Sequence, residues 1–187
     1  MSDARTRVLQ SERLLLRAMT VDDVDPLMTV FTDPIVMAAF GGVLFDREQM
    51  ERWVARNLAH QTRYGYGLYT VVHRGDDMVI GDCGLENMEI DGAQEIELGY
   101  DLRSDYWGRG LATEAARTVR DHAFRRLDVK RLISLIRLGN TASCRIAEKI
   151  GMQHERDHVR GSIPYRVYAV ERRLVGRDSG LRDGHNP

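Results

Sequence analysis

A glycine-rich segment between a strand pattern and a helix pattern constrains the fold of this chain most. Residues 108–112 read GRGLA, and the alternating residues before them, 94–102, are typical of a strand. Residues 113–127 place alanine and valine on one helical face, and an apolar run typical of a strand follows at 131–136. A strand, helix and strand in this order normally set the two strands side by side and parallel.

The residues ahead of this unit predict an antiparallel meander. Strands at 68–73 and 78–85 flank a turn at 74–77, and a second turn at Asp91-Gly92 leads into the strand at 94–102. Three strands joined by two tight turns run antiparallel. We therefore expect a mixed sheet that is antiparallel before the glycine-rich segment and contains one parallel pair after it.

Shorter patterns complete the expected architecture. An apolar run bounded by charges predicts a first strand, and apolar residues at helical spacing predict two helices that lie between it and the meander. A short helix and a last strand follow the parallel unit. The expected ranges are 13–17 for the first strand, 20–31 and 46–64 for the two helices, 140–150 for the short helix and 165–172 for the last strand.

Length and charge restrict the class of protein. The chain has 187 residues, and we expect one domain over 1–175 followed by a polar, disordered tail over 176–187. A net charge of −1 argues against a nucleic-acid binder. No run approaches the roughly 20 apolar residues that span a bilayer. We expect a cytoplasmic protein with neither a nucleic-acid nor a membrane partner.

Cysteine and histidine spacing gives no sign of a metal. Cys83 and Cys144 make no disulfide framework, and the six histidines are scattered without ligand spacing. We expect no metal site. Cys144 is interpreted as a small structural residue, because it lies one residue off the helix face that carries Asn140 and Ser143.

The glycine-rich segment has the chemistry of an anion site. Gly108 and Gly110 permit backbone torsions that turn several N–H groups inward. The helix that follows adds free amides and the positive end of its dipole, which suits a diphosphate. The segment matches neither the GxGxxG nor the GxxxxGK[ST] pattern of nucleotide sites. A plain turn without a ligand is the alternative.

A second helix start falls at the same edge of the predicted sheet. Asn140 is a good N-cap, and Ser143 lies three residues later on the same face. The starts of both helices in such a unit lie near the carboxyl ends of the parallel strands, where ligands bind. Asn140 either caps its helix only or also hydrogen-bonds the amides of an extended ligand.

Together these segments resemble the GNAT superfamily of acetyl-CoA-dependent N-acyltransferases. The resemblance rests on WGRGLATEA and NTASCRIAEKIGM, with one strand between them. SERLLLRAMTVDDVDPL and IELGYDLRSDYWGRG are similar to the RimJ/RimL-like branch, the ribosomal-protein N-terminal acetyltransferases. The resemblance covers about residues 11–173. It implies a three-layer α+β fold with a mostly antiparallel central sheet, helices on both faces and a splayed parallel strand pair.

The resemblance also implies a site for acetyl-CoA, with no metal. The backbone from Tyr100 to Leu102 would pair with the pantetheine arm, and Asn140 would bond its amides. Trp107 departs from the glutamine or arginine usual in the superfamily, although similar branch members share it. The residues expected around the diphosphate are Trp107, Gly108, Arg109, Gly110, Leu111, Ala112 and Thr113.

The catalytic groups are less clearly marked. Many superfamily members place a tyrosine seven residues after the asparagine, where this chain has Ala147. Ser143, one turn earlier, either protonates the departing thiolate instead or is only a small surface residue. Glu97 is the first candidate base and Glu86 the second; the alternative for Glu97 is a solvent-facing carboxylate or an arginine partner.

The expected function is direct transfer of an acetyl group from acetyl-CoA to a primary amine, most simply the N-terminal amine of a protein or peptide. Alternatives are a small amine such as an antibiotic or polyamine, a non-catalytic acyl-CoA-binding module and a nucleotide-binding protein. The partners would be acetyl-CoA and the amine acceptor, and the chain would act as a monomer or a homodimer.

Overall fold

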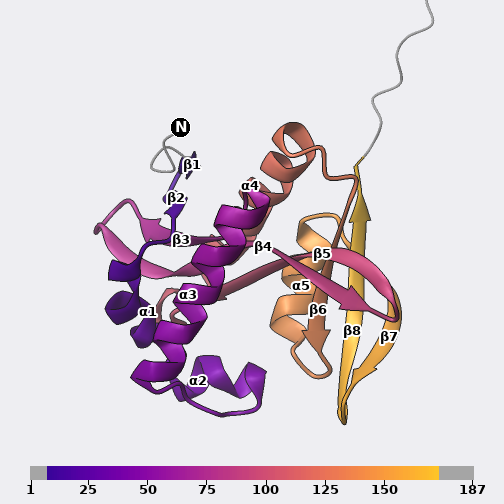
Figure 1. Ribbon diagram of the computed structural model, residues 1–187, viewed down its shortest axis with the longest axis horizontal. Helices are drawn as coiled ribbons and strands as arrows, with labels where there is room; N and C mark the ends of the chain where they lie inside the picture. Colours follow the sequence, from indigo (N-terminus) through magenta and orange to yellow (C-terminus); the bar gives the residue numbers. More distant parts are fainter. Residues whose placement is uncertain (1–7, 173–187) are drawn as a thin grey trace, which may run out of the picture.

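Residues 8–172 are described by a computed structural model (Figure 1). Eight strands form one sheet in the order β1-β2-β3-β4-β5-β6-β8-β7, and every neighbouring pair is antiparallel except β5 and β6. The predicted mixed sheet is confirmed, whereas the tail expected over 176–187 lies outside the described residues. The strands are β1 (Val8–Gln10), β2 (Leu14–Ala18), β3 (Leu68–His73), β4 (Met78–Ile90), β5 (Ala93–Leu102), β6 (Arg131–Arg137), β7 (Gln153–Arg160) and β8 (Ile163–Glu171).

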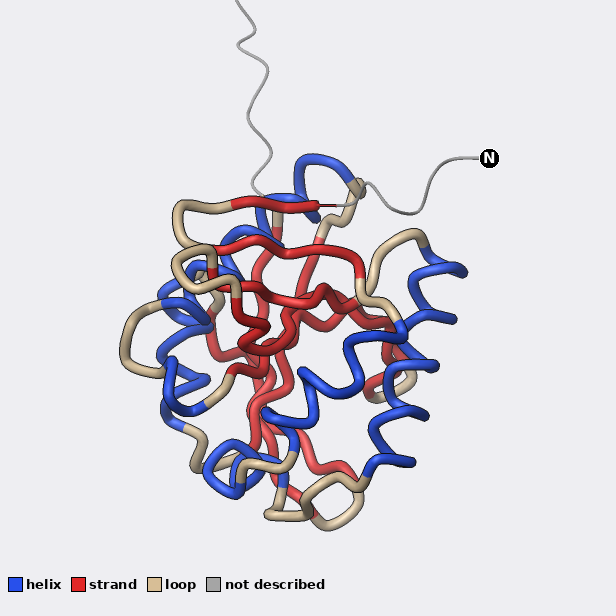
Figure 2. The backbone as a smooth tube through the Cα atoms, turned by 90° about the vertical axis from the view of Figure 1, so that its left-hand side faces the viewer, coloured by secondary structure: helices blue, strands red, loops and turns tan. Residues whose placement is uncertain are grey.

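Helices cover both faces of the sheet, as expected (Figure 2). One core packs α1 and α3 against Leu68 of β3, and the other packs α4 and α5 against the middle strands. The helices are α1 (Val24–Phe31), α2 (Pro34–Met37), α3 (Arg47–Tyr64), α4 (Leu111–Arg126) and α5 (Thr141–Lys149), with short 3-10 turns η2 (Val21–Asp23), η3 (Ala38–Phe40) and η4 (Ser104–Tyr106).

Side-chain alternation along β5 gives the two faces different chemistry. Leu98 and Leu102 are buried in the core that contains α4 and α5. Because successive residues of a strand point to opposite faces, Glu97, Gly99 and Asp101 lie on the other face, toward α1 and α3. One face of the sheet centre is therefore apolar, and the other carries carboxylates.

The parallel pair diverges soon after it meets. The pairing of β5 with β6 consists of one position, Glu97 opposite Ile133. Beside it, the Ser134 hydroxyl donates to the Leu98 carbonyl at 2.7 Å, and the Leu135 N–H donates to the Glu97 carboxylate at 3.1 Å instead of to the backbone of β5. The predicted splayed pair is thus present, and the Glu97 side chain lies where the strands part.

Several element boundaries differ from the sequence prediction. β4 continues to Ile90, and α4 begins at Leu111 instead of at 113. Residues 33–34 end α1 as expected but also begin α2, because the Asp33 carboxylate accepts the Ile35 N–H at 2.8 Å and proline suits the first helical turn. β1 and β7 are not in the prediction, since one is very short and the other is a polar edge strand.

Candidate active site

The start of α4 leaves its first amides open. Gly108 and Gly110 have φ of 74° and 78°, a left-handed conformation that side chains disfavour. Gly110 is the N-cap and has no side chain with which to cap the helix. The N–H groups of the first turn, which includes the buried Leu111 and the part-buried Ala112 and Thr113, therefore meet no cap from that residue. This arrangement suits an anion such as a diphosphate.

Contacts from the N-terminal part of the chain hold this loop in place. The Arg13 guanidinium donates to the Arg109 carbonyl at 2.8 Å and pairs with the Glu114 carboxylate at 2.7 Å. The Ser11 hydroxyl donates to the same carboxylate at 2.7 Å. The protein's own side chains therefore hold the loop in shape.

The side chains next to the glycines are engaged within the protein. The Trp107 indole N–H donates to the Leu102 carbonyl at 2.8 Å, which ties the loop to the end of β5. Arg109 donates to the Asp105 carbonyl at 2.9 Å and lies over the Tyr106 ring. The neighbouring Arg103 pairs with Asp105 at 2.8 Å. In this loop the backbone, more than the arginines, is available to a ligand.

The start of α5 lies beside the splayed strand. The Asn140 side-chain oxygen accepts the Ser143 N–H at 3.1 Å, so Asn140 caps its helix. Its amide NH₂ group remains available as a donor. The Ser143 carbonyl accepts the Tyr100 hydroxyl at 2.9 Å, which joins β5 to α5. Ala147 is fully buried in the core, one turn beyond Ser143.

Glu97 combines a central position with a perturbed proton affinity. Burial raises the pKa of Glu97 to about 7, and the negative charge of Glu86 adds to the effect. Glu86 lies directly opposite on β4, is 30% exposed and has the Arg56 guanidinium 3.7 Å away. A carboxyl group with a pKa near 7 is well suited to exchange protons at neutral pH. Sequence reasoning left open whether Glu97 faces solvent; in the structure it is part-buried, and its carboxylate accepts the Leu135 N–H.

Two further carboxyl groups were missed by sequence reasoning. Asp82 on β4 lies directly opposite Asp101 on β5, and the side chain of Asp82 is 1% exposed. Burial raises the pKa of Asp101 to about 7 and that of Asp82 well above its usual range. The signal was present in the sequence, because Asp82 interrupts the apolar strand pattern at 78–85.

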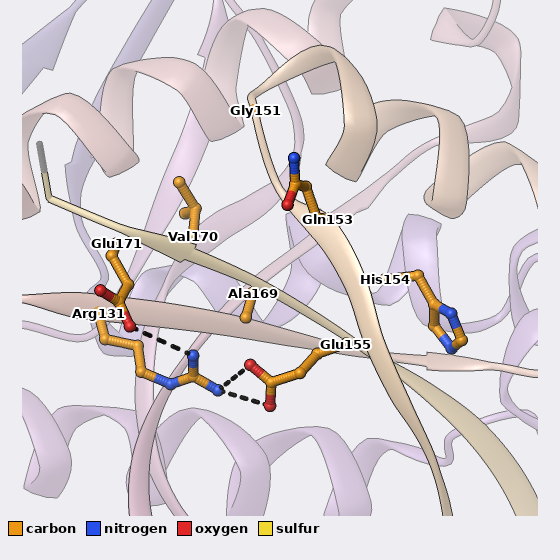
Figure 3. A pocket seen from close by; sticks show the side chains of 8 residues that line it. All are labelled: Arg131, Gly151, Gln153, His154, Glu155, Ala169, Val170 and Glu171. Carbon is orange, nitrogen blue, oxygen red and sulfur yellow. Dashed lines mark hydrogen bonds and ion pairs between the residues drawn. The ribbon is translucent and has the colours of Figure 1, made fainter.

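A separate hollow lies at the other end of β6. It has a volume of about 420 Å³ and is lined by residues of β6, β7 and β8 (Figure 3). Arg131 pairs there with Glu155 at 2.8 Å, with Glu95 at 3.2 Å and with Glu171 at 3.9 Å. The arginine is thus neutralised by the protein itself, and the hollow carries no sign of the chemistry at the splay.

Comparison with known proteins decides the family. Residues 13–153 match the model of the acetyltransferase (GNAT) domain. The chain belongs to the GNAT family. This GNAT protein is 34% identical to the uncharacterised protein YkkB of Bacillus subtilis (strain 168) over 167 residues, which span 89% of this chain and 96% of YkkB. The predicted resemblance and the class of N-acetyltransferase are confirmed.

Solved structures share the fold of this GNAT protein. An acetyltransferase from Agrobacterium tumefaciens superposes with a TM-score of 0.75 at 27% identity, covering 88% of this chain and 94% of that protein. The ribosomal L7/L12 α-N-protein acetyltransferase RimL, in complex with coenzyme A, has a TM-score of 0.74 at 20% identity and covers 88% and 98%. GNAT acetyltransferases use acetyl-CoA as the acetyl donor.

Between residues 8 and 172, no helix is both long and apolar enough to cross a membrane. Within the same range, no three histidine, cysteine, aspartate or glutamate side chains gather in a way that could hold a metal ion.

Proposed function

We propose that this chain transfers the acetyl group of acetyl-CoA directly to a primary amine at the divergence of β5 and β6. The observation that carries the proposal is the position of Glu97, a carboxyl group with a pKa of about 7 at the point where the two strands part. The uncapped start of α4 and the diverging edge of β5 support a coenzyme site beside it.

The chain's own groups suit the parts of coenzyme A. The amides from Gly108 to Thr113 would hold the diphosphate, with Trp107 fixing the loop against β5. The backbone from Tyr100 would pair with the pantetheine arm. The Leu102 carbonyl already accepts the Trp107 indole, so Leu102 would contribute little as an acceptor. The Asn140 NH₂ group would donate to a pantetheine carbonyl.

Proton transfer is assigned to two side chains. Acetyl-CoA supplies an activated acyl group when bound. Glu97 would take a proton from the attacking amine, which must be neutral to react. A backbone N–H on the diverging part of β5 would stabilise the oxyanion. The Ser143 hydroxyl, which donates no hydrogen bond to the described residues, would protonate the departing thiolate.

The proposed acceptor is the N-terminal amine of a protein or peptide. RimL, whose fold this chain shares, is described as a ribosomal-protein α-N-acetyltransferase. A small amine is the second candidate, because the carboxylates beside Glu97 suit any compact cation. The protein would act as a monomer or a homodimer.

Turnover tests the proposal directly. Purified protein should bind acetyl-CoA in calorimetry and release free thiol when an accepted amine or N-terminal peptide is added. Binding without release across a broad amine panel would indicate a non-catalytic acyl-CoA-binding module. Absence of any heat or stabilisation with millimolar acetyl-CoA would contradict the coenzyme site, and competition by ATP or NAD would indicate a nucleotide-binding protein.

A further inference from the structure

Four carboxyl side chains share one face of β4 and β5. Asp82 is paired across the strands with Asp101, and Glu86 with Glu97. Directly opposed residues of antiparallel strands point to the same face, and residues four apart along a strand do as well. The two pairs therefore lie on the face toward α1 and α3, with their backbones about 13 Å apart along the strands.

Glycines lie between the two carboxyl pairs. Gly84 opposes Gly99 at the midpoint. A side chain at Gly84 would collide with the backbone of β3 at Gly67 and Leu68, whereas a side chain at Gly99 would meet nothing within 4 Å. There is thus open space above Gly99, with a carboxyl pair on each side of it along the strands.

The pair formed by Asp82 and Asp101 has no counter-charge. Both carboxylate oxygens of Asp82 are buried without a hydrogen-bond partner among the described residues. Among residues 8–172, no lysine, arginine or histidine forms an ion pair with either aspartate, and the nearby Arg17 and Arg56 pair with Asp23 and Glu86. Buried carboxyl groups are normally hydrogen-bonded or paired, because leaving them alone is costly.

The hydrogen-bond donors nearest to the aspartate pair bind other carboxylates. Thr70 on β3 lies opposite Asp82, but its hydroxyl donates to Asp23 at 2.8 Å. Arg17, the next residue in this row, also donates to Asp23 at 2.8 Å. At the second pair, Arg56 lies 3.7 Å from Glu86. The aspartate pair is therefore left without a donor: the Asp82 oxygens are sealed inside the protein, and the part-exposed Asp101 is the member of the pair that a ligand can reach.

The raised pKa of Asp101 is consistent with a carboxyl pair that binds a cation. Burial, together with the negative charge of Glu86, raises the pKa of Asp101 to about 7. Such a group is partly protonated at neutral pH in the empty site. A cation placed beside it favours the ionised form and would lower that pKa.

We infer that the acceptor is a dication, whose reacting amine lies over Gly99 beside Glu97 and whose second cationic group lies against the part-exposed Asp101 carboxylate, with Asp82 buried behind it. This inference rests on the proposed acetyl transfer. Asp101 is two residues from Gly99, so the two nitrogens would be separated by about 7 Å. A four-carbon diamine and a peptide with lysine as its second residue both present two cations on this scale.

Matched acceptors test the inference through their ratio of kcat/KM. 1,4-Diaminobutane is compared with 1-aminobutane, and a peptide with lysine at position two is compared with one that has methionine there. The wild-type protein should prefer at least one dicationic acceptor by about tenfold or more, the usual effect of a hydrogen bond to a charged group. A preference for 1,4-diaminobutane over 1-aminobutane would indicate that the acceptor is a small diamine. A preference for the peptide with lysine at position two would indicate that it is a protein N-terminus.

Substitutions of Asp82 and Asp101 test whether the aspartate pair causes the preference for dicationic acceptors. Asp101→Asn and Asp82→Asn should bring the ratio toward one. Glu89→Gln, which removes an exposed carboxylate from the same strand, should leave it unchanged. Circular dichroism and thermal melts of each variant show that it is folded, and if Asp82→Asn does not fold, Asp101→Asn alone decides.

The outcomes separate this inference from the function on which it rests. Turnover of amines with equal kcat/KM for dications and monocations overturns the dication inference and leaves acetyl transfer standing. If no amine is turned over, the proposed acetyl transfer is contradicted. Calorimetry of 1,4-diaminobutane with the coenzyme A-bound protein then decides whether the cation site exists. Binding that Asp101→Asn weakens supports the cation site, and absence of binding overturns it.

Discussion

Asp82 is the side chain whose surroundings differ most from what its chemistry requires. It is enclosed by protein, has the Asp101 carboxyl opposite, and accepts no hydrogen bond from the described residues. A carboxylate in this position costs free energy as soon as it ionises. The folded state therefore favours the protonated form of Asp82.

This cost predicts a pH-dependent gain from Asp82→Asn. The folded-state pKa of both aspartates is raised, so their contribution to stability is greatest below the unfolded value of about 4 and is lost as the pH rises toward 7. The asparagine cannot ionise, and its NH₂ group can donate to Asp101. Thermal melts should show that the substitution raises Tm by several degrees more at pH 8 than at pH 5.

Glu89→Gln is the control for that comparison, since it removes an exposed carboxylate from the same strand. Its Tm should change by the same small amount at both pH values. An Asp82→Asn shift that is equal at pH 5 and pH 8 would show that Asp82 is not held in its protonated form.

Ser143 is predicted to act on the leaving group and not on binding. Ser143→Ala should lower kcat about tenfold or more, because a general acid typically contributes at least that much, and should leave the Kd of acetyl-CoA unchanged. Thr141→Ala, an exposed residue of the same helical turn, is the matched control. An unaltered kcat would assign the proton to another donor, such as the Tyr100 hydroxyl at the same helix start.

Sequence alone could single out candidate residues only where their chemistry coincided with a local pattern. Glu97 and Asn140 stood out because each falls at a strand or helix position with a known use. Asp82 and Asp101 did not stand out, because alternation along a single strand cannot show that two aspartates from different strands oppose each other. Their significance depends on the register of β4 with β5 and on burial.

At the scale of elements, the proposed coenzyme site depends on the start of α4. Gly110→Ala should lower acetyl-CoA affinity about tenfold or more, since the strain of a side chain at φ 78° would move the amides that meet the diphosphate. Gly92→Ala is a matched control, because Gly92 also has φ 78° and lies in the turn between β4 and β5. Both variants should lose about 1 kcal/mol of stability.

Calorimetric measurement of the Kd of acetyl-CoA distinguishes the effects of the two substitutions. Only Gly110→Ala should change the Kd, while chemical denaturation should show similar losses for both variants. Equal acetyl-CoA affinity in the two variants would remove the α4 start from the coenzyme site.

Elements with strong periodicity could be predicted from sequence, and those held by their partners could not. Apolar spacing and turn residues in the sequence predict the meander, α4, β6 and α5. β7 reads QHERDHVR and has no apolar face; it is a strand because its backbone pairs with β8 at the sheet edge. The 153–160 segment could therefore be recognised only once β8 was in place.

At the scale of the whole molecule, the sheet separates two kinds of surroundings. One face packs an apolar core against α4 and α5, and the other presents carboxyl groups toward α1 and α3. The two faces of the sheet are connected at Glu97, where β5 and β6 diverge. In the proposed reaction, acetyl-CoA lies at this divergence and the amine lies on the carboxyl face.

The pH profile of kcat/KM in the wild-type protein and in Glu97→Gln tests this account most directly. Glu97 accepts a proton only when ionised, so wild-type kcat/KM should rise with pH to an inflection near 7. Glu97→Gln should be about 100-fold slower or more and should lack that inflection, while it binds acetyl-CoA with unchanged affinity. An inflection near 7 that persists in Glu97→Gln, at a rate close to that of the wild type, would contradict the assignment of Glu97 as the base.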